Sequence, residues 1–172
     1  MQLWFLFGKS GAGKSYVGRL CVEVFGFTHY DGDRDLSPAM KQAIAAQRRF
    51  TPAMRAEFAV LLAENIRSTW HELARVEPHS PGLVVCQGLF KERERGWLHE
   101  RFPDARWLWV RTEPELLSTR LGQRTAHAAS AAYAELINAD FEPPQLAHDI
   151  LDNDGDRTRV IQQLNALGFT AR

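Results

Sequence analysis

The sequence predicts an α/β fold in which helices cover a parallel sheet. Short apolar runs alternate along the chain with longer segments whose apolar residues recur every three or four positions, the pattern of strands alternating with amphipathic helices. Residues 83–86 are apolar without interruption, as expected for a strand that is buried on both faces of a parallel sheet. A glycine-rich loop at residues 8–15 joins the first apolar run to the first helical segment. Right-handed crossovers between such units make the sheet parallel.

Five short strands are expected. They cover residues 3–7, 27–30, 83–86, 106–110 and 150–151. In a parallel sheet with helices on its faces, ligands gather at the carboxyl ends of the strands. The segments expected around one crevice are therefore residues 8–15, 31–33, 87–91, Arg111 and Asn153.

Start and stop signals define the helices of the first half. Apolar residues recur at helical spacing over residues 17–25, and Gly26 ends that helix. Ser37 and Thr51 each stand directly before a proline, which pairs an N-cap side chain with a proline in the first turn. The second of these helices carries an apolar stripe over residues 54–73.

Three helices are expected in the second half. A short one contains residues 97–98. Another begins at Thr112, which forms the pattern of a capping box with Glu115. The last begins at residues 154–156 and is closed by Gly168.

Composition favours one globular domain over residues 1–172. The formal net charge is zero, so neither nucleic acid nor an anionic membrane is an expected partner. No apolar run reaches the length of a membrane span, and a strand and loop at the N-terminus leave no room for a signal peptide. Cys21 and Cys86 lie in apolar surroundings, which predicts buried, reduced thiols. We expect a cytoplasmic monomer or homodimer.

Residues 8–15 fit the pattern Gly-x-x-x-x-Gly-Lys-Ser. Gly8 and Gly13 permit a tight loop whose N–H groups point inward and, with the positive end of the next helix, bind phosphate oxygens. In this pattern Lys14 reaches the β- and γ-phosphates, and the Ser15 hydroxyl binds Mg²⁺. A chance match is the alternative. The strand before the loop and the helix after it favour nucleotide binding.

Asp31 and Asp33 flank Gly32 at the end of the second expected strand. Strand alternation would direct both carboxylates into the crevice. Phosphoryl transfer needs a metal and a positioned hydroxyl, so one acid is expected beside the metal and the other beside the acceptor. We assign Asp31 to the metal and Asp33 to the acceptor. The reverse assignment stays open, and the alternative for both is a solvated Asp-Gly turn.

Two absences narrow the class of nucleotide-binding protein. Gln87 and Gly88 follow the third strand, where many ATPases carry an acid that binds magnesium. The chain also has no Asn-Lys-x-Asp motif for guanine. Both favour a compact small-molecule kinase over a motor or a switch protein.

Arg120 and Arg124 are four residues apart and precede an alanine-rich stretch. We expect a lid at about residues 122–134 that brings arginine onto the transferring phosphate. The alternative is that these cations stabilise the C-terminus of a helix. Residues 91–95 alternate basic and acidic side chains, a pattern that favours a solvated face, with an acid-binding role for one of the cations as the alternative.

The chain resembles the gluconokinase branch of the small P-loop kinases, near shikimate kinase. The segments that carry the resemblance are residues 8–15, 30–33, 84–86 and 141–144, with Arg55, Arg120, Arg124 and His127. The resemblance implies the three-layer fold of P-loop nucleoside-triphosphate hydrolases, with a five-stranded parallel sheet in the order 2-3-1-4-5. It also implies acceptor-binding helices at about residues 37–76, lid arginines over ATP, and Asn153 near the adenine.

The chain departs from gluconokinases in the acceptor half. Where that family carries His-Pro, Asn, Lys-Met and an acidic run ending in arginine, only Arg55 is kept. Its Ser-Ala-Leu-Lys after the third strand is replaced here by residues 87–90, Gln-Gly-Leu-Phe. These changes argue against gluconate itself as the acceptor.

We therefore expect a kinase of carbohydrate metabolism that uses ATP and Mg²⁺ to phosphorylate a hydroxyl of a small polar metabolite, such as a sugar acid. The catalytic residues would be Lys14, Asp33 and Arg124. The nucleotide-binding residues would be Gly8, Lys9, Ser10, Gly11, Ala12, Gly13, Lys14, Ser15, Tyr16, Arg120 and Asn153. The acceptor-binding residues would be Asp31, Asp33, Arg55, Gln87, Gly88 and His127, and the metal ligands Ser15 and Asp31. The alternatives are a nucleotide or nucleoside kinase, a 5′-hydroxyl nucleic-acid kinase, and a regulatory protein that binds nucleotide without turnover.

Overall fold

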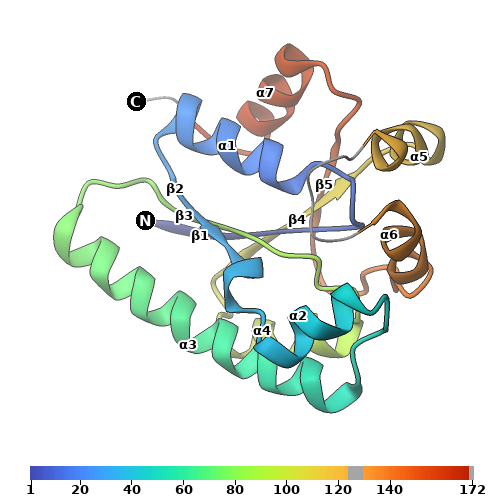
Figure 1. Cartoon of the computed structure of the whole chain (residues 1–172). Helices are drawn as coiled ribbons and strands as arrows, with labels where there is room; N and C mark the ends of the chain where they lie inside the picture. The colour runs from blue at the N-terminus through green and yellow to red at the C-terminus, as the bar shows by residue number, and fades with distance from the viewer. Residues whose placement is uncertain (124–129, 171–172) are drawn as a thin grey trace.

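The computed structural model describes residues 1–123 and 130–170, and its strands form one parallel sheet (Figure 1). The strands are β1 (Gln2–Phe7), β2 (Thr28–Asp31), β3 (Gly82–Cys86), β4 (Arg106–Arg111) and β5 (Asp149–Asp152). They pair in the order β2-β3-β1-β4-β5, all in parallel. The predicted fold class and the strand order implied by the resemblance are confirmed.

Helices cover both faces of the sheet and make three layers (Figure 1). On one face lie α1 (Lys14–Phe25) and α7 (Arg157–Ala166), and on the other lie α3 (Pro52–Val76) and α4 (Glu92–Arg101). The remaining helical segments are the 3-10 turn η1 (Gly32–Asp35), α2 (Pro38–Ala45), α5 (Pro114–Gly122) and α6 (Ala131–Asn138).

Alternating side chains of β1 enter two separate cores. Trp4 and Leu6 pack with α1 and α7, while Phe5 and Phe7 pack with α3 and α4, and all four are fully buried. Every residue of β3 is also buried, as its apolar sequence predicts. The carboxyl ends of these two central strands, where the glycine-rich loop and residues 87–90 begin, are thereby held in place from both faces.

The predicted starts of α2 and α3 are confirmed. The Ser37 hydroxyl accepts a hydrogen bond from Met40 N, and the Thr51 hydroxyl accepts one from Met54 N, both at 3.2 Å. Each contact joins residues three positions apart, so the local sequence is sufficient to form it.

The predicted capping box at Thr112 is wrong. Helix α5 begins at Pro114 with Glu113 at its N-cap and no side-chain cap. The Thr112 hydroxyl instead lies 3.0 Å from the carbonyl oxygen of Ala12 and 3.2 Å from that of Asn153. It is held beside carbonyls of the glycine-rich loop and of the segment after β5, which are distant in sequence, and so does not cap the helix.

The predicted lid lies only partly within the described chain. Residues 124–129, which include Arg124 and His127, lie outside the described residues, and the lid stays a prediction. No helix in the described ranges has both the length and the apolar character needed to cross a membrane.

Candidate functional site

The glycine-rich loop leaves β1 and enters α1 at the edge of the sheet where the strands end. Gly8, Gly11 and Gly13 have φ values of 144°, 93° and 89°, in a region where the backbone of a residue with a Cβ atom is strained. A Cβ atom on Gly8 would lie 2.4 Å from the Val110 carbonyl oxygen, and one on Gly13 would lie 2.1 Å from Asn153 Nδ2. The glycines are therefore required both by backbone conformation and by close packing.

The N-terminus of α1 suits an anion. Gly13 is its N-cap, no side chain caps it, and no acid lies in its first turn. Backbone N–H groups at such a position, with the helix dipole, bind phosphate oxygens. Lys14 Nζ donates to the carbonyl oxygens of Gly8 and Lys9, each at 3.0 Å, so its ammonium lies across the loop.

The segment after β5 and the helix α5 support this loop through Asn153 and Arg120. Asn153 is buried, and its Nδ2 donates to the Ala12 carbonyl oxygen at 2.8 Å. Arg120 Nη1 donates to the Thr112 hydroxyl at 3.2 Å, beside the same carbonyl. Neither Asn153 nor Arg120 lines the cavity that extends from the loop to helices α2, α3 and α6. Both have loop-supporting contacts, and the expected contacts with ATP stay predictions.

Helix α6 is attached to the loop by a pair of hydrogen bonds that the sequence does not signal. Ser10 N donates to Asn138 Oδ1 at 2.8 Å, and Asn138 Nδ2 donates to the Ser10 carbonyl oxygen at 3.0 Å. Helix α1 is held from the other side, because Cys86 Sγ lies 3.3 Å from the Lys14 carbonyl oxygen. Cys21 and Cys86 are buried as predicted, and burial raises the pKa of the Cys21 thiol to about 12.

Asp31 and Asp33 both line the cavity, but strand alternation is not the reason, and that part of the prediction is wrong. The strand β2 ends at Asp31, and the chain turns through η1. Asp31 Oδ1 accepts a hydrogen bond from Asp33 N at 3.0 Å, and Asp33 Oδ1 accepts one from Gln87 Nε2 at 2.9 Å. The turn and the contact with Gln87 therefore orient the two carboxylates.

Asp35, a third acid, holds this turn in place. Its side chain is buried and accepts hydrogen bonds from the Tyr30 hydroxyl at 2.6 Å and from Asn65 Nδ2 at 2.8 Å. Burial, followed by the hydrogen bond to Asp35, raises the pKa of the Tyr30 phenol. Sequence analysis missed Asp35, although its place two residues after Asp33 was the available signal.

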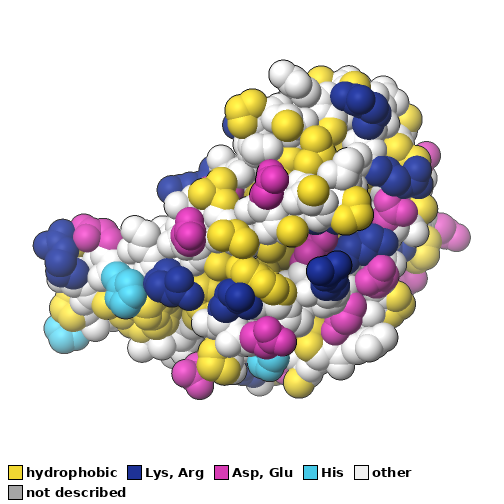
Figure 2. Space-filling view, turned by 90° about the horizontal axis from the view of Figure 1, so that it is seen from below, with side chains coloured by type: hydrophobic (Ala, Val, Ile, Leu, Met, Phe, Trp, Pro, Cys, Tyr) yellow, Lys and Arg dark blue, Asp and Glu magenta, His cyan; other side chains and the backbone are white. Residues whose placement is uncertain are grey.

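A cavity of about 750 Å³ extends from the loop to helices α2, α3 and α6. The predicted residues that line it are Ser10, Gly11, Gly13, Lys14, Ser15, Tyr16, Asp31, Asp33, Arg55, Gln87 and Gly88. Gly8, Lys9 and Ala12 belong to the loop but do not line the cavity. On the surface formed by the side of the molecule that carries α3 and α4, hydrophobic side chains are exposed between acidic and basic ones (Figure 2).

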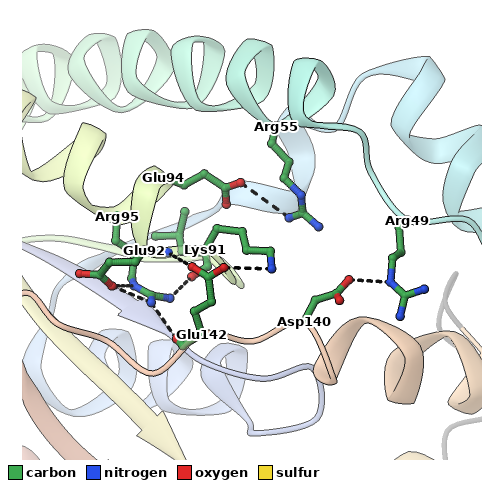
Figure 3. Close-up of polar contacts among 9 residues, drawn as sticks. Arg49, Arg55, Lys91, Glu92, Glu94, Arg95, Asp140 and Glu142 are labelled. Carbon is green, nitrogen blue, oxygen red and sulfur yellow. Dashed lines mark hydrogen bonds and ion pairs between the residues drawn. The ribbon is translucent and has the colours of Figure 1, made fainter.

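Arg55 meets an acid that sequence analysis did not select. Its Nη1 lies 3.7 Å from Glu94 Oε1, and the two side chains are 16% and 15% exposed (Figure 3). Burial raises the pKa of Glu94, while the Arg55 guanidinium opposes that shift. Arg55 therefore reaches the cavity as half of an ion pair that joins α3 to α4.

The predicted solvated face at residues 91–95 is wrong. Arg93 is exposed, but Arg95 is fully buried, and Lys91 Nζ lies 3.1 Å from Glu142 Oε1 (Figure 3). An alternation of basic and acidic residues does not distinguish an exposed cation from a buried one. The acid that pairs with Lys91, Glu142, is 51 positions away in the chain.

Arg95 joins the segment after β3 to the segment after α6. Its Nη1 donates to the Leu89 carbonyl oxygen at 2.6 Å and its Nη2 to the Glu142 carbonyl oxygen at 2.7 Å. Its Nε donates to Glu92 Oε2 at 2.8 Å, and the guanidinium lies 5.4 Å from the centre of the Phe7 ring. Leu89, which lines the cavity, has a φ of 44°, so this buried cation holds a strained part of the cavity wall.

Known structures identify this architecture. No protein-family model and no curated protein matches the chain. A sugar kinase from Janibacter sp. HTCC2649 has a similar structure, with a TM-score of 0.77 and 18% identity over 99% of this chain and 96% of that one. The chain has the fold of the small P-loop kinases. A gluconokinase from Sinorhizobium meliloti 1021 gives a TM-score of 0.74 at 21% identity, over 96% of this chain and 93% of that one.

A shikimate kinase from Bacteroides thetaiotaomicron is also similar, with a TM-score of 0.58 and 16% identity over 96% of each chain. At these identities the similarity concerns the small P-loop kinase fold.

Proposed function

We propose that the protein is a phosphotransferase that moves the γ-phosphoryl group of Mg·ATP to a hydroxyl of a small molecule. The observation that carries the proposal is one cavity that is lined both by part of the glycine-rich loop, where it enters the N-terminus of α1, and by Asp31 and Asp33. Phosphoryl transfer needs donors for phosphate and an acid that orients the nucleophile, and these residue types meet there.

The residues of the loop fit a triphosphate. The positions of Gly8 and Gly13 exclude side chains, and the N-cap of α1, Gly13, has no side chain that could cap the first turn. Ser15 and Asp31 would hold Mg²⁺, an ion that in nucleotide sites takes few protein ligands and completes its shell with phosphate and water. ATP would supply the phosphoryl group, and Mg²⁺ would offset the negative charge of the phosphates.

Each polar residue of the cavity then has a role in the proposed reaction. Lys14 leaves its carbonyl contacts within the loop and holds the transferring phosphate. Asp33, oriented by Gln87, accepts the hydrogen bond of the acceptor hydroxyl and then its proton. Arg124, in the expected lid, would add positive charge to the phosphate. A metal role for Asp31 and an acceptor role for Asp33 belong to this proposal.

Replacing Lys14 tests the proposed function. We expect Lys14→Ala to slow Mg·ATP-dependent ADP release by roughly 10²-fold or more, because its charge contact strengthens in the transition state. ADP release is measured across a panel of sugar acids, polyols, nucleosides and apolar alcohols, and circular dichroism checks the fold.

Arg75→Ala is the matched control, because Arg75 is a 72% exposed cation in the last turn of α3. It should leave the rate unchanged. A Lys14→Ala rate within a factor of a few of wild type would contradict phosphoryl transfer, and nucleotide binding without any turnover would favour a regulatory protein.

A further inference from the structure

The half of the cavity beyond Asp31 and Asp33 has an apolar wall. Its members come from segments spread between η1 and α6, and several carry aromatic rings. They are Leu36, Met40, Ile44, Ala45, Phe50, Phe58, Leu89, Phe90, Tyr133 and Ile137. Hydroxyls of a sugar acid placed against this wall would lose hydrogen bonds to water without replacement, whereas an apolar ring would be stabilised by leaving water.

Among the residues that the structure describes, the charges in this half are compensated or solvated. Arg55 is paired with Glu94, and both side chains are largely buried (Figure 3). Lys41 also lines the cavity but is exposed on α2. A carboxylate is bound best by an arginine whose fork is free to make two parallel hydrogen bonds. Here an acceptor carboxylate would compete with Glu94 for Arg55, so the wall does not favour an acid.

One polar group in the wall lacks a partner among the described residues. Tyr133 is 2% exposed, and its buried hydroxyl forms no hydrogen bond to any part of the chain that the structure describes. Leaving such a group unpaired destabilises a protein, so its partner is expected in the occupant of the cavity. Tyr133 lies on α6, which is held at both ends. At its start the Ser130 hydroxyl accepts a hydrogen bond from Tyr133 N at 3.1 Å, and at its end Asn138 bonds to the glycine-rich loop.

We propose, on the basis of the phosphotransferase function above, that the acceptor is an uncharged alcohol with an apolar ring and a polar group that hydrogen-bonds to Tyr133. The alcohol faces Asp33 and the loop, and the ring lies against the apolar wall. In the reaction, the bond between the γ-phosphorus and the bridging oxygen of ATP breaks, and a bond from phosphorus to the alcohol oxygen forms. The alcohol proton leaves to Asp33, and ADP is the second product.

Three probes test this proposal: 2-(4-hydroxyphenyl)ethanol, 2-phenylethanol and gluconate. Binding is measured by calorimetry in the presence of Mg²⁺ and a non-hydrolysable ATP analogue, and turnover by ADP release with ATP. We expect saturable binding of both phenylethanols and none of gluconate. Tyr133→Phe should weaken the binding of 2-(4-hydroxyphenyl)ethanol by roughly 3- to 10-fold, the effect of one neutral hydrogen bond. It should weaken the binding of 2-phenylethanol by less than about 2-fold.

A second pair of variants tests the wall itself. Ile44→Asp places a carboxylate against the ring of the bound alcohol and should weaken the binding of both phenylethanols by roughly 10-fold or more. Val60→Asp is the matched control, because Val60 is 44% exposed on α3 and does not line the cavity. It should leave binding unchanged. If Ile44→Asp fails to fold, the Tyr133→Phe comparison still tests the proposal.

The outcomes separate this inference from the proposed function. Phosphorylation of gluconate without binding of either phenylethanol would overturn the inference and leave the phosphotransferase intact. Binding of the phenylethanols with no turnover of any alcohol would support the apolar site and contradict the phosphotransferase. Failure of both phenylethanols to bind, or equal losses for both in Tyr133→Phe, would also overturn the inference.

Discussion

Asp33→Asn is expected to lower turnover with the best acceptor of the panel by roughly 10²- to 10⁴-fold, the range for losing a positioned base. The amide oxygen can still accept the hydrogen bond that Gln87 Nε2 gives to Asp33 Oδ1, so the turn should keep its shape. What is lost is the charge and the ability to take the hydroxyl proton. Turnover is measured by ADP release with the wild-type acceptor at saturation.

ATP affinity is the second measurement on this variant. If Asp33 faces the acceptor, Asp33→Asn should change ATP binding by less than about 1 kcal/mol, the net value of an ordinary hydrogen bond. Asp31→Asn is the matched control, because an asparagine can still accept the hydrogen bond from Asp33 N that organises the turn. We expect it to weaken magnesium-dependent nucleotide binding as well as the rate.

The paired result identifies which acid has which role. Damage to ATP binding in Asp33→Asn, with binding spared in Asp31→Asn, would reverse the assignment. If both variants keep full activity, the two acids only form the turn, and the catalytic proposal fails at this step.

Arg95→Ala is expected to lower the free energy of unfolding by about 3–5 kcal/mol. Removing the guanidinium leaves the Leu89 and Glu142 carbonyl oxygens without the donors they now have, and leaves a hole beside Phe7. It also leaves the Glu92 carboxylate, which is 24% exposed, without its cation. Urea denaturation followed by tryptophan fluorescence measures the change.

Arg93→Ala is the control for this prediction. Arg93 has the same charge, lies two residues away in the same helix and is exposed, so its loss should change stability by less than about 0.5 kcal/mol. Equal effects of the two substitutions, or a loss below about 1 kcal/mol for Arg95→Ala, would show that the buried cation does not hold the wall at Leu89.

Much of the fold could be predicted because its signals are local. The caps at Ser37 and Thr51 bond to backbone three residues later. The glycines of the loop have positive φ values, which residues with a Cβ atom rarely adopt. The apolar run of β3 requires burial on both faces, which only an inner strand of a covered sheet provides. These features depend on neighbours in the sequence or on hydrophobicity alone.

The half of the cavity that we propose binds the acceptor depends on contacts between segments far apart in the chain. Whether a charge in residues 91–95 is solvated or buried depends on Glu142 and Leu89 for Arg95, and on Arg55 for Glu94. Thr112 fits a local cap equally well, yet its hydroxyl lies beside carbonyls of the loop and of Asn153.

The sequence by itself determined the parallel sheet, the glycine-rich loop and the pair of acids after β2, because periodicity and backbone conformation are properties of short segments. Only the tertiary structure decided that Arg55 is paired with Glu94 and that the Tyr133 hydroxyl is buried in an apolar wall with no hydrogen-bond partner in residues 1–123 and 130–170. Burial and ion pairing depend on which helices pack around the cavity, and the periodicity of the sequence does not determine that packing.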